Sequence, residues 1–200
     1  MKLTTLILMA AMAAGSAEAK SDHERQVKVY VQDNAGVPFI ILTDARREAG
    51  QIFHSIGVQL VWKQGTPSAS ETDAIIIDLA AKTPDTQVPG ALAYALPFEG
   101  VHIRIFWDRI ARDPASQAVL AHVMVHEITH ILQGVARHSE EGIMKAHWTI
   151  EDRLTMRRTP LSFTPKDVEL IFVGLDARAS RNTNPAGRVD TIAAVTVGAE

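Results

Sequence analysis

The sequence predicts an α+β domain with one hydrophobic core, and three observations support this fold class. The chain has 200 residues, of which 46% are hydrophobic and 22% charged, and a chain of this size and composition can bury a substantial core. Segments with strand-like and helix-like periodicity alternate through its first half. Residues 74–79 form a continuous apolar run between loops, which predicts a strand covered on both faces.

The first half begins with a strand at residues 27–31, where apolar and other residues alternate. We expect a helix to follow with Thr43 as its N-cap and to end at Gly57, because the apolar residues between them share one helical face. Further strands are predicted at residues 58–62, 74–79, 91–96 and 101–107, and the last two are close enough in sequence to pair antiparallel.

The second half contains two well-signalled helices. Asp113 and Pro114 provide an N-cap and a first-turn proline for a helix that runs towards Gly134. The apolar pattern then lapses at residues 136–158, which we expect to be rich in loops. A last helix is predicted from Thr164 as cap, with Asp167 at the capping-box position.

Composition excludes several classes of partner and site. The formal charge is −3 and the longest basic runs are pairs such as Arg157-Arg158, so we expect neither nucleic acid nor anionic lipid as a partner. The chain has no cysteine, which excludes disulfides, thiol catalysis and thiolate ligands. Any zinc site must therefore use His, Asp and Glu side chains.

The N-terminus has the features of an export signal. Lys2 gives a positive n-region, a short apolar stretch follows, and Ala17-Glu18-Ala19 supplies small residues at the cleavage positions. We therefore expect a signal peptide at residues 1–19, a single domain at 20–177 and a polar tail at 178–200. The expected location is periplasmic or secreted, as a monomer without membrane association after cleavage.

The clearest chemical motif is His126-Glu127-Ile128-Thr129-His130, an H-E-x-x-H pattern on the predicted helix. Four residues turn a helix by about 400°, so both imidazoles project from one face at a spacing that suits two ligands of one metal ion. Glu127 lies slightly further round the helix, near the metal, where its carboxylate can accept a proton from a metal-held water.

A catalytic zinc also needs a third protein ligand and an open position. Gly134 permits the left-handed turn that ends the helix, and His138 follows it at a distance that allows the chain to fold back. His138 is the favoured third ligand. The competing ligands are His147, Glu140, Glu141 and Glu151, although Glu151 follows no obvious helical pattern.

These residues resemble the metzincin clan of zinc metallopeptidases, in particular short exported bacterial proteins of that type. The resemblance rests on the three histidines with Glu127 and Gly134, and on Gly142-Ile143-Met144 after them, and it extends over residues 27–175. It implies one zinc ion held by His126, His130 and His138, Glu127 as general base, and Met144 in a tight turn beneath the metal. In metzincins the glycine and the third histidine follow three and six residues after the second histidine, whereas here the intervals are four and eight.

The resemblance also implies an architecture and a substrate path. The architecture is a twisted, mostly parallel sheet with an antiparallel edge strand, a backing helix, an active-site helix and a small irregular C-terminal subdomain with one helix. The edge strand would line the cleft and pair with an extended peptide. Its residues are Ala91, Leu92, Ala93, Tyr94 and Ala95.

The sequence thus predicts an exported zinc-dependent endopeptidase that acts on a peptide or protein. One alternative is a non-catalytic zinc module, in which His147 or Glu151 closes the fourth position. Another is a zinc hydrolase acting on a different amide or ester. We expect His122 to pack or hydrogen-bond rather than bind metal, Trp107 and Trp148 to lie in the core, and Tyr94 to donate to an oxyanion if it faces the cleft.

Overall fold

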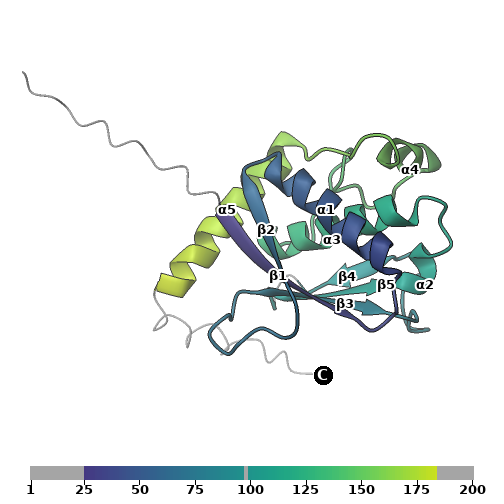
Figure 1. Ribbon diagram of the computed structural model, residues 1–200. Coiled ribbons are helices and arrows are strands. Elements are labelled where there is room, and N and C mark those ends of the chain that lie inside the picture. Colours follow the sequence, from purple (N-terminus) through teal and green to yellow (C-terminus); the bar gives the residue numbers. More distant parts are fainter. Residues whose placement is uncertain (1–24, 97–98, 184–200) are drawn as a thin grey trace, which may run out of the picture.

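A five-stranded sheet forms the base of the domain in the computed structural model, which describes residues 25–96 and 99–183 (Figure 1). The sheet order is β2-β1-β3-β5-β4. All pairs are parallel except β4 with β5, where Tyr94 lies opposite Arg104. The predicted mostly parallel sheet with an antiparallel edge is therefore confirmed. The strands are β1 (Arg25–Asp33), β2 (Val58–Lys63), β3 (Ile75–Ala80), β4 (Ala93–Ala95) and β5 (His102–Phe106).

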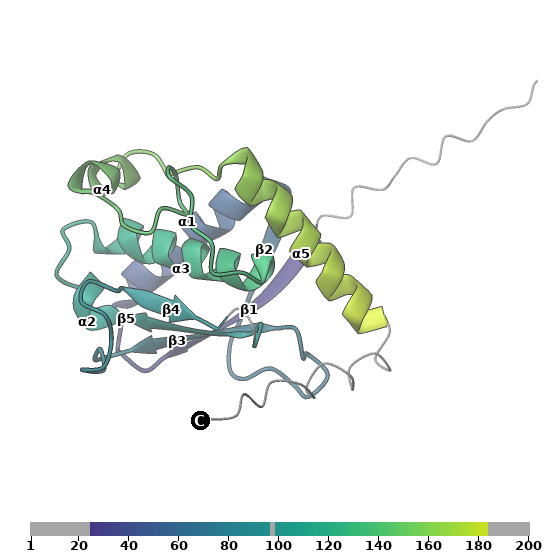
Figure 2. The ribbon, with the colours of Figure 1, turned by 180° about the vertical axis from the view of Figure 1, so that it is seen from behind.

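Two long helices cover one face of this sheet. Both views show α1 and α3 on the same side, with α5 crossing the end of α3 (Figures 1 and 2). The described helices are α1 (Phe39–His54), α2 (Trp107–Ile110), α3 (Ser116–Gln133), α4 (Ile150–Met156) and α5 (Pro165–Thr183). No helix in residues 25–96 and 99–183 is both long and apolar enough to cross a bilayer.

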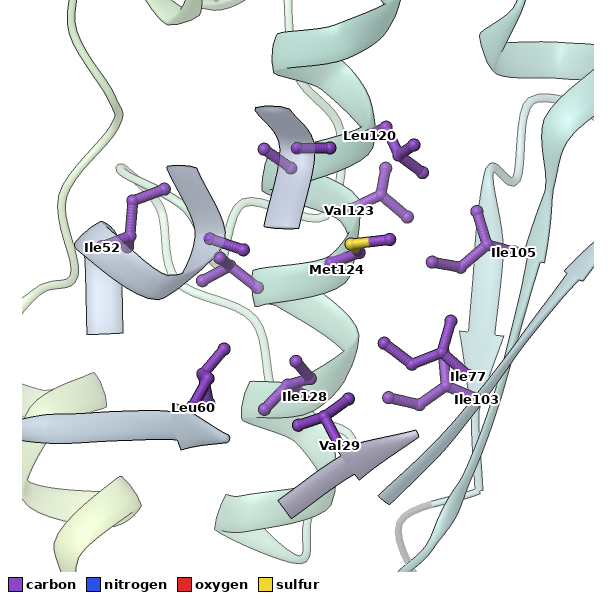
Figure 3. Packing of buried hydrophobic residues seen from close by; sticks show 14 of the residues in the cluster. Val29, Ile52, Leu60, Ile77, Ile103, Ile105, Leu120, Val123, Met124 and Ile128 are labelled. Carbon is purple, nitrogen blue, oxygen red and sulfur yellow. The ribbon is translucent and has the colours of Figure 1, made fainter. Parts of the chain in front are cut away.

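Helix α3 runs through the hydrophobic core. Its residues from Ala118 to Leu132 are all buried, because α1, α5 and the sheet surround it. Met124 and Ile128 lie between the isoleucines of the sheet and the apolar face of α1 (Figure 3). Burial of each such side chain contributes about 1.5–3 kcal/mol, so the core fixes the helix that carries the H-E-x-x-H motif.

Among the residues that the structure describes, no helix covers the other face of the sheet (Figures 1 and 2). Ile75, Ile77 and Leu79 of β3 are buried, whereas Ile76 and Asp78 are half-exposed. Asp78 pairs with Arg104 of β5 at 2.7 Å on this open face. The prediction that residues 74–79 are covered on both faces was therefore wrong, because a half-buried central strand also tolerates isoleucine at an outward position.

Several element boundaries also differ from the prediction. Helix α1 begins at Phe39 rather than after Thr43, because Pro38 presets the entry with φ −51° and the first two helical residues face solvent. The strand expected at 101–107 ends at Phe106, and Trp107 opens the short helix α2. The strand expected at 91–96 spans only Ala93–Ala95.

The segment after α3 holds two helices instead of the one that was predicted. Helix α4 lies in the stretch expected to be loop, and Glu151 is in its first turn, so its helical pattern was missed. Thr149 and Asp152 form a full capping box at its start. Helix α5 continues to Thr183, past the expected domain boundary at 177. The predicted signal peptide lies outside the described residues.

Candidate metal centre

Helix α3 brings the first two histidines of the motif together. The rings of His126 and His130 are 4.7 Å apart between centroids, and both side chains are buried, as is Glu127. The helix ends at Gly134, whose φ of +67° is left-handed, and its N–H donates to the His130 carbonyl at 3.0 Å. The glycine therefore lets the chain reverse next to the second histidine.

The reversed chain carries His138 back to the same place. Its ring centroid lies 5.3 Å from that of His126 and 5.0 Å from that of His130. One nitrogen from each of the three rings lies within 4.8 Å of the others. The longer intervals after the second histidine are thus absorbed in the exposed turn, and the three imidazoles converge as the sequence predicted.

None of the rival third ligands belongs to the cluster of three imidazoles. His147 is exposed and lines the same pocket, but it does not belong to the cluster of three. Glu140, Glu141 and Glu151 are exposed and belong neither to this cluster nor to the pocket lining. In residues 25–96 and 99–183, this triad is the single group of three or more His, Cys, Asp or Glu side chains arranged to hold a metal ion.

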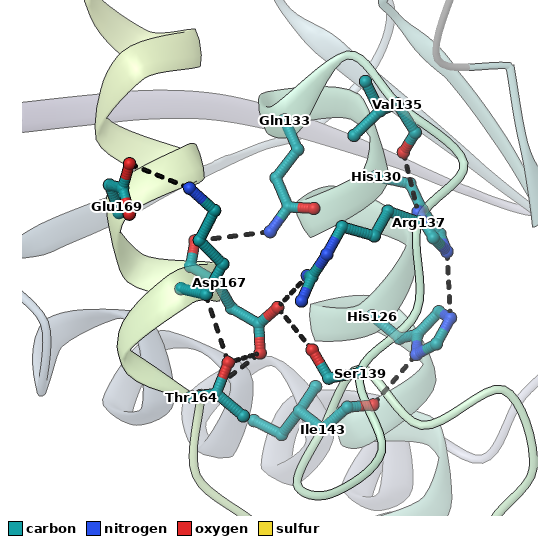
Figure 4. A network of polar contacts seen from close by, with 11 residues as sticks. His126, His130, Gln133, Val135, Arg137, Ser139, Ile143, Thr164, Asp167 and Glu169 are labelled. Atoms are coloured by element: carbon teal, nitrogen blue, oxygen red, sulfur yellow. Dashed lines mark hydrogen bonds and ion pairs between the residues drawn. The ribbon is translucent and has the colours of Figure 1, made fainter.

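Backbone carbonyls fix the tautomers of the two helical histidines. Nδ1 of His126 lies 2.9 Å from the Ile143 carbonyl, and Nδ1 of His130 lies 3.1 Å from the Val135 carbonyl (Figure 4). Because a carbonyl only accepts, each Nδ1 carries the hydrogen and each Nε2 presents a lone pair. Metal-binding histidines are oriented in the same way.

The two Nε2 atoms face each other at 3.0 Å. Two lone pairs at this distance repel unless a proton or a cation lies beside them. Burial, together with the neighbouring imidazoles, lowers the pKa of His126 to about 3, and burial also lowers the pKa of His130 and of His138. A shared proton is therefore disfavoured at neutral pH, and the donor set fits a cation that prefers nitrogen ligands, such as zinc.

Glu127 is placed beside this cluster. Its carboxyl group is buried and lines the same pocket, and burial raises its pKa to about 8. A cation held by the three imidazoles would favour the carboxylate form. The group then has the position and the basicity of a proton acceptor next to the metal.

Met144 lies in a turn after His138. The Ser139 N–H donates to the Met144 carbonyl at 2.7 Å and closes the turn, while the Met144 side chain is fully buried. Gly142 has φ +72°, and a Cβ there would lie 2.3 Å from the Ser162 carbonyl oxygen. The direct support for His126 comes from the preceding residue, Ile143, through its carbonyl.

A pocket of about 350 Å³ opens above the triad. One wall is the segment at residues 88–95, which includes all five residues predicted to meet substrate, and residues 145–148 and Arg153 also line the pocket. The Arg109 guanidinium donates to the carbonyls of Val88 and Ala91, so it fixes the first wall. The three imidazoles and Glu127 belong to the same lining.

The positions of Tyr94 and His122 bear on two further predictions. The Tyr94 ring packs against Phe106 at 5.9 Å on the sheet face that carries Arg104, opposite the core face that meets α3. The ring of Tyr94 therefore lies on the sheet face away from α3, although the residue belongs to the lining of the pocket at this edge strand. His122 is fully buried: its Nδ1 donates to the Ala118 carbonyl at 2.7 Å and its Nε2 accepts from the Leu161 N–H at 3.0 Å. Both nitrogens are used, as expected for a hydrogen-bonding role.

Sequence reasoning missed two kinds of site residue. Trp148 was expected in the core and does pack against it, but it is only half-buried, lines the pocket and meets His126 edge to face at 5.6 Å. The carbonyl acceptors of Ile143 and Val135 had no sequence signal, because any residue type supplies a carbonyl. Trp148 could have been suspected from its position shortly after the Met144 turn.

Comparison with known proteins supports the fold. No family model matches the chain, and a search of curated proteins found no match. Among solved structures, the fold is similar to archaemetzincin from Methanopyrus kandleri, with a TM-score of 0.51 and 15% sequence identity over 78% of this chain and 98% of that one. The chain therefore has a mixed α/β fold similar to that of archaemetzincin, and its three converging histidines could bind a metal ion.

Proposed function

We propose that this protein is a zinc-dependent endopeptidase. The observation that carries the proposal is the approach of the Nε2 atoms of His126 and His130 to 3.0 Å. His138 and the buried carboxylate of Glu127 lie in the same open pocket. The similarity of the fold to archaemetzincin supports the same proposal, because the sequence motif also resembles metzincins. Export belongs to the proposal and rests on the N-terminal sequence alone.

The residues present divide the chemistry between them. His126, His130 and His138 would hold zinc, which when bound supplies the Lewis acidity that activates water and polarises a scissile carbonyl. Glu127 accepts a proton from the attacking water and delivers it to the leaving amine. The hydrogen bonds from Nδ1 of His126 and His130 to backbone carbonyls hold both rings ready for this task.

The edge strand gives the substrate a path. β4 pairs with β5 along one edge only, and its residues line the pocket beside the triad. An extended peptide can add to the other edge through backbone hydrogen bonds, which favours a polypeptide substrate over a small molecule. Ala93 and Ala95 lie opposite Ile105 and Ile103, on the sheet face that meets α3. They line the pocket, and their small side chains leave room for larger substrate side chains.

A non-catalytic zinc module is the second candidate. His147 lines the same pocket and is exposed, so a movement of its loop would let it close the fourth position. A closed site of four protein ligands binds zinc structurally and excludes the water that hydrolysis requires.

Hydrolysis of a peptide panel tests the proposal. Protein loaded with one equivalent of zinc is incubated with internally quenched peptides and with unfolded casein, alongside apo protein and protein treated with a chelator. We expect cleavage inside the peptides by the zinc form, loss of cleavage with the chelator and recovery when zinc is restored. Tight zinc binding without cleavage would favour the non-catalytic module, and cleavage confined to an added set of esters and small amides would favour a different hydrolase.

A further inference from the structure

Asp167 of α5 is a buried carboxylate at the centre of a polar network behind the triad. Its side chain is fully buried, and it accepts four hydrogen bonds from three residues: Thr164, Ser139 and Arg137 (Figure 4). Burial alone would raise the pKa of this carboxyl, but the hydrogen bonds from Thr164, Ser139 and Arg137 lower it below the ordinary value. The group is therefore a charged carboxylate in the folded protein at neutral pH.

Its two oxygens have different partners. Oδ2 accepts from the Thr164 N–H at 3.0 Å and from the Thr164 hydroxyl at 2.6 Å, which is the local contact of a helix cap. Oδ1 accepts from the Ser139 hydroxyl at 2.7 Å and from the Arg137 guanidinium at 2.8 Å. The second set is not local, because both donors lie about 30 residues earlier in the chain.

These distant donors flank the third histidine. Arg137 precedes His138 and Ser139 follows it, so Oδ1 holds the chain on both sides of His138, which is the member of the three converging histidines that is exposed and lies outside α3. The Asp167 carbonyl also accepts from the Gln133 side chain, at the end of α3, at 3.3 Å. Asp167 thus connects α5 to the loop of His138 through its carboxylate and to the end of α3 through its backbone carbonyl.

We propose that Asp167 is a positioning residue for the metal centre, which fixes the backbone at residues 137–139 so that His138 meets the other two imidazoles. The inference rests on the proposed zinc site, but not on catalysis. His126 and His130 are held by their own helix, whereas His138 has no such support. A loop held before the metal arrives loses less conformational freedom on binding, which increases affinity.

The competing explanation is that Asp167 only caps α5. The two explanations can be separated, because Oδ2 makes the cap contacts and Oδ1 makes the contacts with the loop of His138. Thr164→Ala removes the two side-chain cap contacts of Thr164 and leaves the Ser139 and Arg137 contacts in place. Ser139→Ala removes a contact to the ligand loop and leaves the cap intact. Asp167→Asn keeps the volume of the side chain but removes its charge and half of its acceptor capacity.

Zinc affinity measured against a competing chelator, together with urea unfolding of the apo proteins, provides the test. We expect Asp167→Asn to bind Zn²⁺ about 10–100-fold more weakly than the unmodified protein, as is typical when a group that orients a ligand is lost. Ser139→Ala should weaken binding in the same direction and by less. Thr164→Ala should lower the urea midpoint of the apo protein and leave zinc affinity unchanged. With Co²⁺ as the probe, the visible spectrum of Asp167→Asn should shift towards that of His138→Ala.

The outcomes distinguish this inference from the proposed function. Unchanged zinc affinity in Asp167→Asn, or equal losses in Ser139→Ala and Thr164→Ala, would overturn the positioning role. If Asp167→Asn does not fold, the comparison of Ser139→Ala with Thr164→Ala decides by itself. Zinc binding that depends on Asp167 in a protein without hydrolytic activity would retain the inference and reject the peptidase, whereas an unmodified protein that binds no zinc would reject both.

Discussion

Replacement of Glu127 by glutamine is expected to lower the rate of peptide hydrolysis by about 10²–10⁴-fold, the usual contribution of a general acid–base group. The glutamine side chain has nearly the same size, so the buried site beside His126 and His130 should keep its shape. It cannot accept the proton of the attacking water. Glu127 does not belong to the group of three residues that could hold the metal. Zinc should therefore remain bound at one ion per chain.

Initial rates on a quenched peptide, with zinc content measured on the same samples, check this expectation. Glu140→Gln is the matched control, because this carboxylate is exposed, lies two residues after His138 and does not line the pocket. The control should hydrolyse the peptide at the unmodified rate. A Glu127→Gln protein with undiminished activity would remove the proposed base, and one that loses zinc would indicate that Glu127 is a ligand.

Replacement of Gly174 by alanine is expected to have the largest effect on stability. A Cβ at this position in α5 would lie 1.6 Å from the Leu132 carbonyl oxygen and 2.7 Å from its carbon, and both atoms belong to the backbone of α3. Neither helix can yield by rotating a side chain, so the helices must separate. We expect a loss of about 3 kcal/mol in the free energy of unfolding, at the upper end of the usual range for overpacking.

Urea unfolding of the apo protein measures this loss, and Gly50→Ala supplies the control. Gly50 is also inside a helix, but a Cβ there meets only the Trp62 indole nitrogen at the ordinary distance of 3.8 Å. Alanine at position 50 should therefore raise stability by about 0.4–1 kcal/mol through helix propensity and a less flexible unfolded chain. Equal effects of the two substitutions would contradict the close contact between α3 and α5.

Residues with local signals were the ones that sequence reasoning placed well. The H-E-x-x-H spacing put His126 and His130 on one face of a helix, Gly134 ended that helix, and Thr164 with Asp167 capped the last one. Each of these depends on positions within a few residues of one another. The convergence of His138 was also expected, because the glycine permits the necessary reversal.

Features that depend on distant contacts or on the backbone could not be read in this way. The carbonyls that orient His126 and His130 have no residue preference, and the second task of Asp167 depends on donors about 30 residues away. Helix α4 is a different case, since its capping box at Thr149 and Asp152 was present in the sequence. Its Ile150 and Leu154 lie one turn apart but are exposed, and a single apolar pair is too short a pattern to predict a helix from periodicity.

The central claim is that three histidines of this chain hold one zinc ion. Elemental analysis of the dialysed protein, with His138→Ala and His147→Ala in parallel, tests it most directly. We expect about one zinc per chain in the unmodified protein, the same content in His147→Ala, and loss of the metal in His138→Ala. Zinc retained without His138 but lost without His147 would show a different ligand set, and an unmodified protein without zinc would contradict the metal centre itself.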